Sequence, residues 1–314
     1  MDKLISIIMS TYNESKVELN KAIESILNQS YTNYEFIIIL DNPKNDMIKK
    51  ILNEYSKKDD RIKLHFNDEN IGLANSLNLA IKMSSGEYIA RMDADDIAFE
   101  DRLEKEINFL ESNNLDMVST NRIDIDENDL IISKKSNLPK LEKINRLLPL
   151  GNFITHPTVL IKRSVIESLN GYRNFPSSQD YDLWLRVLSK NYKIGILDEE
   201  LLFYRIRTNS ISNKDKYKQY LIKQYQKQLY FDRKKYGYDK FSEENLKLFL
   251  ENSSYSKKKD AFNYGITVLD KGIRNLNNKK YITGIVYVLK SFTTSKAVMD
   301  EFFSTLKYKI LCKI

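Results

Sequence analysis

The sequence predicts an α/β protein with a mixed, mostly parallel sheet flanked by helices and a C-terminal all-helical extension. In the first two thirds of the chain, short apolar runs alternate with amphipathic segments. This alternation is typical of a parallel sheet with right-handed crossovers. From residue 213 onward, apolar residues recur at intervals of three and four, which is helical spacing.

The first 96 residues contain the clearest strands and helices. The strands are continuous apolar runs, and each helix carries its apolar side chains on one face. The expected order is a strand at Leu4–Met9, a helix at Val17–Asn28, a strand at Tyr34–Leu40, a helix at Met47–Lys58, a strand at Ile62–Phe66, a helix at Ala74–Met83 and a strand at Tyr88–Met92.

Residues 97–212 have a less regular pattern. The segment at 134–149 is polar and partly helical, and we expect a loop that moves over a bound ligand. The other expected elements are a helix at Glu100–Leu115, short strands at Met117–Ser119 and Ile123–Ile125, an extended segment at Asn152–Ile161, a helix beginning at Gln179 and a strand at Lys193–Leu197.

Charge marks a boundary near residue 213. Residues 1–212 carry 28 Lys and Arg against 33 Asp and Glu, a balance of −5, whereas residues 213–314 carry 22 against 10, a balance of +12. The basic part also holds 11 of the 20 tyrosines. Its expected helices are Lys214–Lys235, Glu243–Glu251, Lys257–Asn275, Tyr281–Phe292 and Lys296–Ile310.

Composition excludes several classes of protein. The single cysteine, Cys312, cannot form an internal disulfide, and with two histidines a Cys/His zinc site is not expected. No apolar run approaches the length that spans a bilayer, and the first residues lack a signal-peptide pattern. We therefore expect a cytoplasmic location.

Polar residues follow three of the predicted strands, at Thr11–Glu14, Asp41–Asn42 and Asp93–Asp96. The carboxyl ends of parallel strands meet at one edge of a sheet, where ligands bind. Three carboxylates at one strand end repel each other unless a cation lies between them, and Mg²⁺ or Mn²⁺ bound to a diphosphate suits such oxygen ligands. The alternative is an acidic turn in which Asp95 or Asp96 caps the next helix.

A nucleotide at this edge would be bound without the common phosphate loops. Neither GxGxxG nor GxxxxGK[ST] is present. Tyr12 is a candidate stacking platform for a base, and Asp41 or Asn42 could accept a hydrogen bond from a base N–H. An ordinary half-buried strand-end tyrosine is the alternative for Tyr12.

The order of these motifs resembles the inverting family 2 glycosyltransferases of GT-A fold, a Rossmann-like fold, over roughly residues 3–212. The acidic stretch contains that family's DxD motif. The matching pieces are Ser6–Asn13, Asn70–Leu73, Gly86–Asp96, His156-Pro157-Thr158, Gly171-Tyr172, Gln179–Arg186 and Tyr204-Arg205.

This resemblance implies a site for a nucleotide-sugar donor with Mn²⁺ or Mg²⁺. Asp93 and Asp95 correspond to the metal-binding acids, and Arg91 could reach the diphosphate or form a salt bridge with Asp93. Asn42 and Pro43 depart from the family pattern, which usually has a second Asp followed by Gly. The implied nucleotide-sugar residues are Thr11, Tyr12, Asn13, Glu14, Asp41, Asn42, Asn70, Arg91, Asp93, Ala94 and Arg207.

The resemblance also implies a catalytic base and a sugar pocket. Asp180 matches the base that removes the acceptor hydroxyl proton, while Gln179 replaces a common Glu. His156, Gln179 and Trp184 are expected to line the acceptor and sugar pocket, although His156 could be simply hydrogen-bonded and Trp184 could be core. Asp182 reads as a helix-terminal acid. Arg207 stands where related sequences often have His, and Arg can bind a diphosphate bidentately.

These assignments predict a metal-dependent inverting hexosyl- or N-acetylhexosaminyltransferase. It would use a nucleotide sugar, expected to be a UDP-sugar, on a saccharide or lipid-linked acceptor in capsule-type surface polysaccharide assembly. The alternatives are a sugar-phosphate nucleotidyltransferase and a non-catalytic carbohydrate-binding module. We expect a catalytic domain at 1–212, with a donor half at about 1–96 and an acceptor half at about 97–212.

The basic extension at 213–314 has two readings. It could attach peripherally to an anionic membrane surface, or pack against the catalytic domain or a second subunit as a homo-oligomer. Nucleic acid is not expected as a partner because no recognised binding motif is present.

Overall fold

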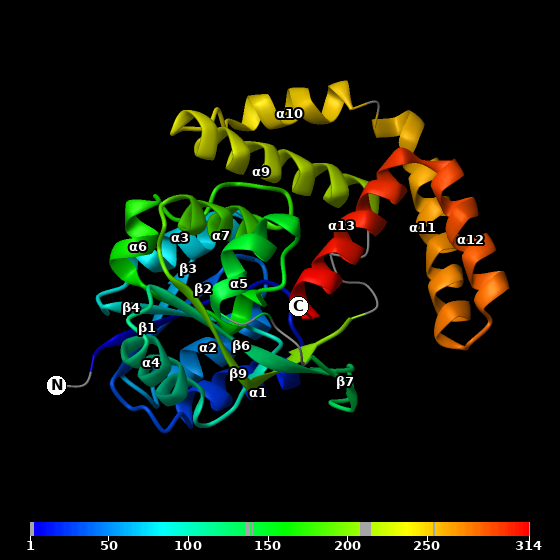
Figure 1. Cartoon of the computed structure of the whole chain (residues 1–314). Coiled ribbons are helices and arrows are strands. Elements are labelled where there is room, and N and C mark those ends of the chain that lie inside the picture. The colour runs from blue at the N-terminus through cyan, green and yellow to red at the C-terminus, as the bar shows by residue number, and fades with distance from the viewer. Residues whose placement is uncertain (1–2, 136–138, 140, 208–214, 254, 314) are drawn as a thin grey trace. The chain divides into compact units, whose positions relative to one another are not determined.

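A computed structural model describes residues 3–135, 139, 141–207, 215–253 and 255–313 (Figure 1). The chain divides into two compact units, and the boundary predicted at residues 212 and 213 lies outside the described residues. The first unit comprises Met1–Ile144, Phe153–Asn174 and Gln179–Arg207, and the second comprises Asn145–Asn152, Phe175–Ser178 and Thr208–Ile314.

The first unit is built on one mixed sheet. Among the described residues its strands follow the order β3-β2-β1-β4-β8-β6-β9-β5, with β7 paired to β6. Pairing is parallel from β3 to β4 and between β6 and β9, and antiparallel elsewhere. The strands are β1 (Ile5–Thr11), β2 (Tyr34–Leu40), β3 (Ile62–Phe66), β4 (Tyr88–Asp93), β5 (Ile97–Ala98), β6 (Met117–Ile125), β7 (Ile131–Lys135), β8 (Leu160–Lys162) and β9 (Ile194–Arg205).

Helices connect these strands as expected. Every residue of β2 is buried, which explains its unbroken apolar run, because helices cover both faces of a central parallel strand. The helices up to residue 189 are α1 (Lys16–Leu27), α2 (Asp46–Ser56), α3 (Leu73–Met83), α4 (Arg102–Ser112), α5 (Leu141–Leu147), the 3₁₀ turns η1 (Leu148–Leu150) and η2 (His156–Thr158), α6 (Arg163–Ser168) and α7 (Gln179–Ser189).

The later part of the sheet differs from the prediction. The two short strands expected between residues 117 and 125 form one strand, β6, and the strand expected at 193–197 continues to residue 205 as β9. β6 and β9 pair over their length, but the register shifts near Thr120 and Asn121. These irregularities interrupt the alternation of side chains, so the sequence does not show one continuous strand pattern. The loop expected at 134–149 contains the end of β7 and α5, and residues 136–138 and 140 lie outside the described residues.

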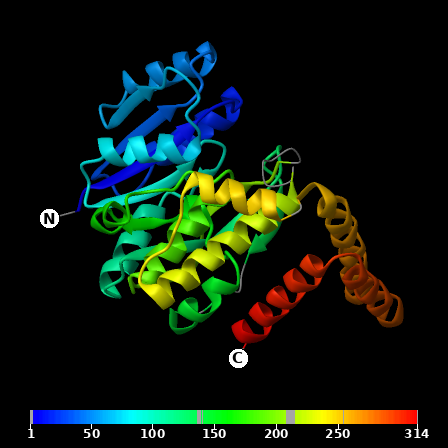
Figure 2. The same cartoon turned by 90° about the horizontal axis from the view of Figure 1, so that it is seen from above.

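The second unit consists mainly of helices close to those expected. They are α9 (Lys216–Tyr236), α10 (Glu243–Asn252), α11 (Tyr255–Asn277), α12 (Tyr281–Thr294) and α13 (Lys296–Lys313). Tyr217, Phe262, Leu269, Val288 and Val298 belong to one of its buried clusters. The helices α11 and α12 lie side by side (Figure 1, Figure 2). No helix in the described part of the chain is both long and apolar enough to span a bilayer.

Candidate active site

The parallel strands bring the predicted donor residues to one edge of the sheet. In the register of β1, Thr11 lies opposite Leu40 of β2 and Ser10 lies opposite Asp93 of β4. The polar residues that follow these three strands therefore converge, as the carboxyl ends of parallel strands must.

Glu14 organises the loop after β1. Its Oε2 accepts hydrogen bonds from Thr11 Oγ1 at 2.5 Å, from Tyr12 N at 2.8 Å and from Asn13 N at 3.1 Å. The Tyr12 side chain is 45% exposed, and its carbonyl accepts a bond from Asn42 Nδ2 at 3.1 Å. The loop is thus held by side chains while the Tyr12 ring remains open to a stacking partner.

Asp41 holds the loop between β3 and α3. It is 4% exposed, and it accepts hydrogen bonds from Asn67 Nδ2 at 2.7 Å and from the backbone N–H groups of Ile71 and Gly72, both at 2.9 Å. Gly72 has a φ of 83°, which favours glycine there. The exposed Asn70 also accepts from Gly72 N, at 3.0 Å. Asp41 therefore shapes the loop that carries Asn70.

Arg91 forms an ion pair with Asp93, which is the structural alternative that the sequence left open. The Arg91 side chain is 2% exposed, and within the described residues its Nε and Nη1 have no hydrogen-bond partner. Ala94, next in the chain, is buried. Two buried guanidinium nitrogens without a partner close to the end of β4 are unusual, because buried donors are normally paired.

Asp95 lies in a region of excess negative charge. Burial and the repulsion of Asp93 raise the pKa of Asp95 to about 7, with Glu14 and Glu18 adding to the effect and Arg207 opposing it. Arg207 Nη2 lies 3.1 Å from Asp95 Oδ2 and 3.2 Å from Glu18 Oε2. Arg207 thus supplies a positive charge beside the second acid of the DxD motif.

Asp96 does not cap the following helix, so that part of the prediction is wrong. Its buried Oδ1 accepts a bond from Arg205 N at 2.8 Å, and Asp101 precedes α4 as the N-cap residue. Arg205 also donates to the Asp95 carbonyl at 2.8 Å. The third acid therefore fixes the end of β9 to the acidic turn.

His156, Tyr172 and Trp184 form one aromatic cluster. His156 Nε2 lies 2.8 Å from the Tyr172 hydroxyl, and its ring is 6.0 Å from the Trp184 ring in an edge-on arrangement. The packing around His156 lowers its pKa well below the usual value, and Arg91 lowers it further, so the ring is neutral. Trp184 is 1% exposed, and in the described structure its indole N–H has no partner.

Tyr172 connects this cluster to α3. Burial raises the pKa of Tyr172, and the charges of Arg91, Asp180 and Asp93 also act on it. The side-chain amide of Asn78, on α3, makes two hydrogen bonds to the backbone of Tyr172. It accepts from the Tyr172 N–H at 2.7 Å and donates to the Tyr172 carbonyl at 2.8 Å.

The two acids at the start of α7 have different surroundings. Asp180 and Gln179 are half-buried, and the negative charge of Asp180 contributes to the raised pKa of Tyr172. Asp182 is fully buried and accepts from Arg186 Nε at 2.8 Å. Arg186 also donates to backbone carbonyls of Leu169 and Gly171. Asp182 therefore lies in the first turn of α7, as predicted, and is also the buried ion-pair partner of Arg186.

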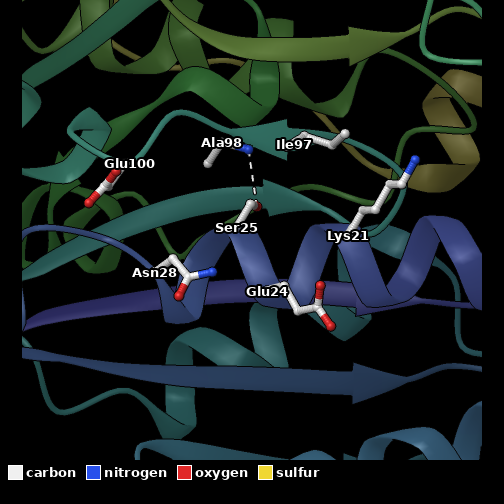
Figure 3. Close-up of a pocket in the computed structure, with 7 residues that line it drawn as sticks. All are labelled: Lys21, Glu24, Ser25, Asn28, Ile97, Ala98 and Glu100. Atoms are coloured by element: carbon white, nitrogen blue, oxygen red, sulfur yellow. Dashed lines mark hydrogen bonds between the residues drawn. The ribbon is translucent and has the colours of Figure 1, made fainter.

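A separate pocket of about 270 Å³ lies between α1 and β5 (Figure 3). Ser25 Oγ accepts from Ala98 N at 3.1 Å across it. None of the predicted site residues lines this pocket, whose residues are Lys21, Glu24, Ser25, Asn28, Ile97, Ala98 and Glu100.

Comparison with known proteins identifies the family. Residues 6–169 match the family described as "Glycosyl transferase family 2". The chain belongs to glycosyltransferase family 2. It is 40% identical over 225 residues to an uncharacterized glycosyltransferase of Methanocaldococcus jannaschii, covering 70% of this chain and 78% of the relative. It is also 40% identical over 210 residues to the O-antigen biosynthesis glycosyltransferase WbnJ of Escherichia coli, covering 66% of this chain and 81% of the relative.

Solved structures share the fold of this family 2 member. TarS 1–349 of S. aureus in complex with UDP-GlcNAc superimposes with a TM-score of 0.58 at 16% identity, covering 78% of this chain and 70% of that one. The mannosyltransferase PcManGT of Pyrobaculum calidifontis, in complex with GDP-Man and Mn²⁺, gives 0.55 at 15% identity, covering 97% and 86%. The predicted GT-A-like fold, with its C-terminal helices, is confirmed.

Three residues around the site have no role predicted from the sequence. Tyr172, Glu18 and Arg205 each contact a predicted site residue or its backbone. Glu18 had a local signal, because Ser15 and Glu18 form a capping box at the start of α1. Tyr172 follows Gly171, which has a φ of 66°, and such glycines mark turns that aim the next side chain.

Proposed function

We propose that this glycosyltransferase moves a sugar from a nucleoside diphosphate sugar, expected to be a UDP-sugar, to a hydroxyl of a saccharide or lipid-linked acceptor with inversion. The convergence of Tyr12, Asp93 and Asp95 at the carboxyl ends of β1 and β4 is the main support. An exposed aromatic ring for the base and paired acids for a metal-bound diphosphate are what such a donor needs. The name of WbnJ supports a surface polysaccharide as the product.

Asp93 and Asp95 fit a divalent ion such as Mn²⁺ or Mg²⁺. Their oxygens are hard ligands, and burial together with the charge of Asp93 raises the pKa of Asp95, as expected where a carboxylate lacks a bound cation. The described residues contain no group of three or more acidic, His or Cys side chains suited to a metal. Donor phosphates and water would therefore complete the shell, and the bound ion would offset charge on the leaving diphosphate.

Arg207 and Arg91 would assist the departure of the nucleoside diphosphate. Arg207 lies against Asp95 with a third of its side chain exposed, so it can reach a phosphate oxygen from that position. The unpaired N–H groups of Arg91 are fixed near the end of β4 by the ion pair with Asp93. Guanidinium groups bind phosphates bidentately and stay charged.

Asp180 would act as the base on the opposite side of the sugar. It takes the proton of the acceptor hydroxyl while that oxygen bonds to the anomeric carbon and the bond to the diphosphate oxygen breaks. Attack opposite the leaving group inverts the configuration at that carbon. His156 and Gln179 would line the pocket for the sugar or acceptor, with the neutral His156 held by Tyr172 and the buried Trp184 packed against His156.

A donor screen tests this proposal. The full-length chain is incubated with individual UDP- and GDP-sugars and a mixture of saccharide acceptors, with Mn²⁺, Mg²⁺ or EDTA, and the released nucleoside diphosphate is measured. We expect acceptor-dependent release with one donor class, abolished by EDTA. Release of pyrophosphate instead would indicate a nucleotidyltransferase, and donor binding without turnover would indicate a binding module.

A further inference from the structure

The helix α12 has two faces of different character. One face packs closely on α11, since a Cβ added at Gly284 would lie 2.7 Å from Leu276 Cγ and one added at Gly272 would lie 2.9 Å from Val288 Cγ2. The opposite side is apolar yet open to solvent, with Ile282 83% exposed and Leu289 58% exposed. This side is not part of the core of the second unit.

The exposed apolar residues form one stripe, here called the α12 stripe. Its members are spaced by three and four residues, so they lie on the same side of the helix. Each is more than half exposed. The α12 stripe consists of Ile282, Ile285, Val286 and Leu289.

The sequence around the α12 stripe is basic, between Asp270 and Asp300. From residue 271 to residue 299 the sequence has no Asp or Glu, and it has six Lys and Arg. All six side chains are exposed, and Lys271 also lies over the Tyr287 ring. The cations are Lys271, Arg274, Lys279, Lys280, Lys290 and Lys296.

We propose that the α12 stripe docks onto an anionic lipid bilayer surface. An amphipathic helix in the plane of a bilayer immerses its apolar face at the headgroup boundary, while neighbouring Lys and Arg attract anionic headgroups. The α12 stripe and the six exposed cations of residues 271–299 offer both contributions. This docking does not depend on the proposed transfer chemistry.

The charge distribution favours a bilayer over other occupants. In a symmetric dimer the same patch faces itself, which would bring the cations of both copies together without any carboxylate from residues 271–299. Nucleic acid would pair with the cations but would leave the four aliphatic side chains of the α12 stripe without apolar contact. A lipid surface satisfies both kinds of group.

Vesicle flotation with the full-length chain tests the proposal. The vesicles are either phosphatidylcholine alone or equal parts phosphatidylcholine and phosphatidylglycerol, at low salt. We expect flotation only with the anionic vesicles. The double variant Ile282→Ser, Leu289→Ser should bind at least about tenfold more weakly, because it removes most of the apolar area available for immersion. Lys279→Gln with Lys280→Gln should also weaken binding by about tenfold or more.

A matched control separates the α12 stripe from general surface hydrophobicity. Leu248→Ser on α10 removes an exposed aliphatic side chain, 48% exposed, and should leave flotation unchanged. The proposal is overturned if the wild-type chain stays unbound, floats equally with neutral vesicles, or loses binding equally in the control. A second copy of the chain would be the occupant instead if sedimentation shows a dimer, the double variant is monomeric, and its flotation equals that of the wild type. That result would also overturn the proposal.

Discussion

Two aspartates on α7, two residues apart, should lose different properties on the same substitution. Asp180 is half-buried beside Tyr172, whereas Asp182 is fully buried against Arg186. Replacing each in turn by Asn removes one negative charge with little change in volume. We expect Asp182→Asn to lower stability and Asp180→Asn to lower turnover.

The magnitude for Asp182→Asn follows from its burial. Removing one partner of a buried ion pair costs about 3–5 kcal/mol, because the other charge remains buried without compensation. Arg186 is 4% exposed but keeps bonds to the carbonyls of Leu169 and Gly171, so we expect the lower end, about 3 kcal/mol. For a domain of this size this corresponds to a fall in Tm of roughly 6–12 °C.

For Asp180→Asn the expected loss is kinetic. A positioned general base contributes about 10²- to 10⁴-fold to the rate, so kcat should fall by that factor. The Tm should fall much less than in Asp182→Asn, because Asp180 is half-buried whereas Asp182 is fully buried in an ion pair.

Thermal unfolding followed by circular dichroism and nucleoside diphosphate release separate the two effects. At a temperature where both variants are folded, Asp182→Asn should retain most of its turnover. An unchanged Tm for Asp182→Asn would refute the argument from burial. Wild-type kcat in Asp180→Asn would refute its assignment as the base.

Two further predictions concern Arg207 and Glu35. Arg207→Ala should raise the donor KM several-fold in steady-state assays, because a phosphate ligand is lost; an unchanged donor KM would remove that role. Burial alone would raise the pKa of Glu35, but hydrogen bonds from Lys63, Ser6 and Ser85 lower it to about 2. The ionised Glu35 therefore stabilises the fold above its ordinary value of 4.5, and this contribution is lost as pH falls toward 2. In urea titrations, the stability advantage of the wild type over Glu35→Gln should shrink by roughly 2 kcal/mol between pH 7 and pH 2, allowing for screening at the half-exposed Lys63. A pH-independent difference would contradict this linkage.

The N-terminal part of the fold was predictable because its signals are local. Strands β1, β2 and β4 are buried along nearly their whole length, so each appears as an apolar run. Strands β5 and β8 have two and three residues, and partners distant in sequence define them. No local pattern could reveal such short strands.

The position of the acidic turn was predictable from the sequence, but its contacts were not. The acidic turn and its place after β4 follow from the sequence. The contact of Asp96 with Arg205 joins residues 109 apart, and only the tertiary structure brings them together. In the same way, His156 and Trp184 were expected in one pocket, whereas the contact of Tyr172 with His156 depends on the turn at Gly171.

Asn78 sets a limit on how the proposed sugar pocket can be redesigned. Its amide accepts from the N–H of Tyr172 and donates to the carbonyl of the same residue, as a neighbouring strand would. Only a side chain with both an acceptor and a donor at this length can replace both bonds; Asp lacks the donor and Leu lacks both. In a library that varies positions 78 and 172 together, functional clones should retain Asn at 78 while position 172 changes. Selection for a new sugar would thus act on one side chain while its backbone support stays constant.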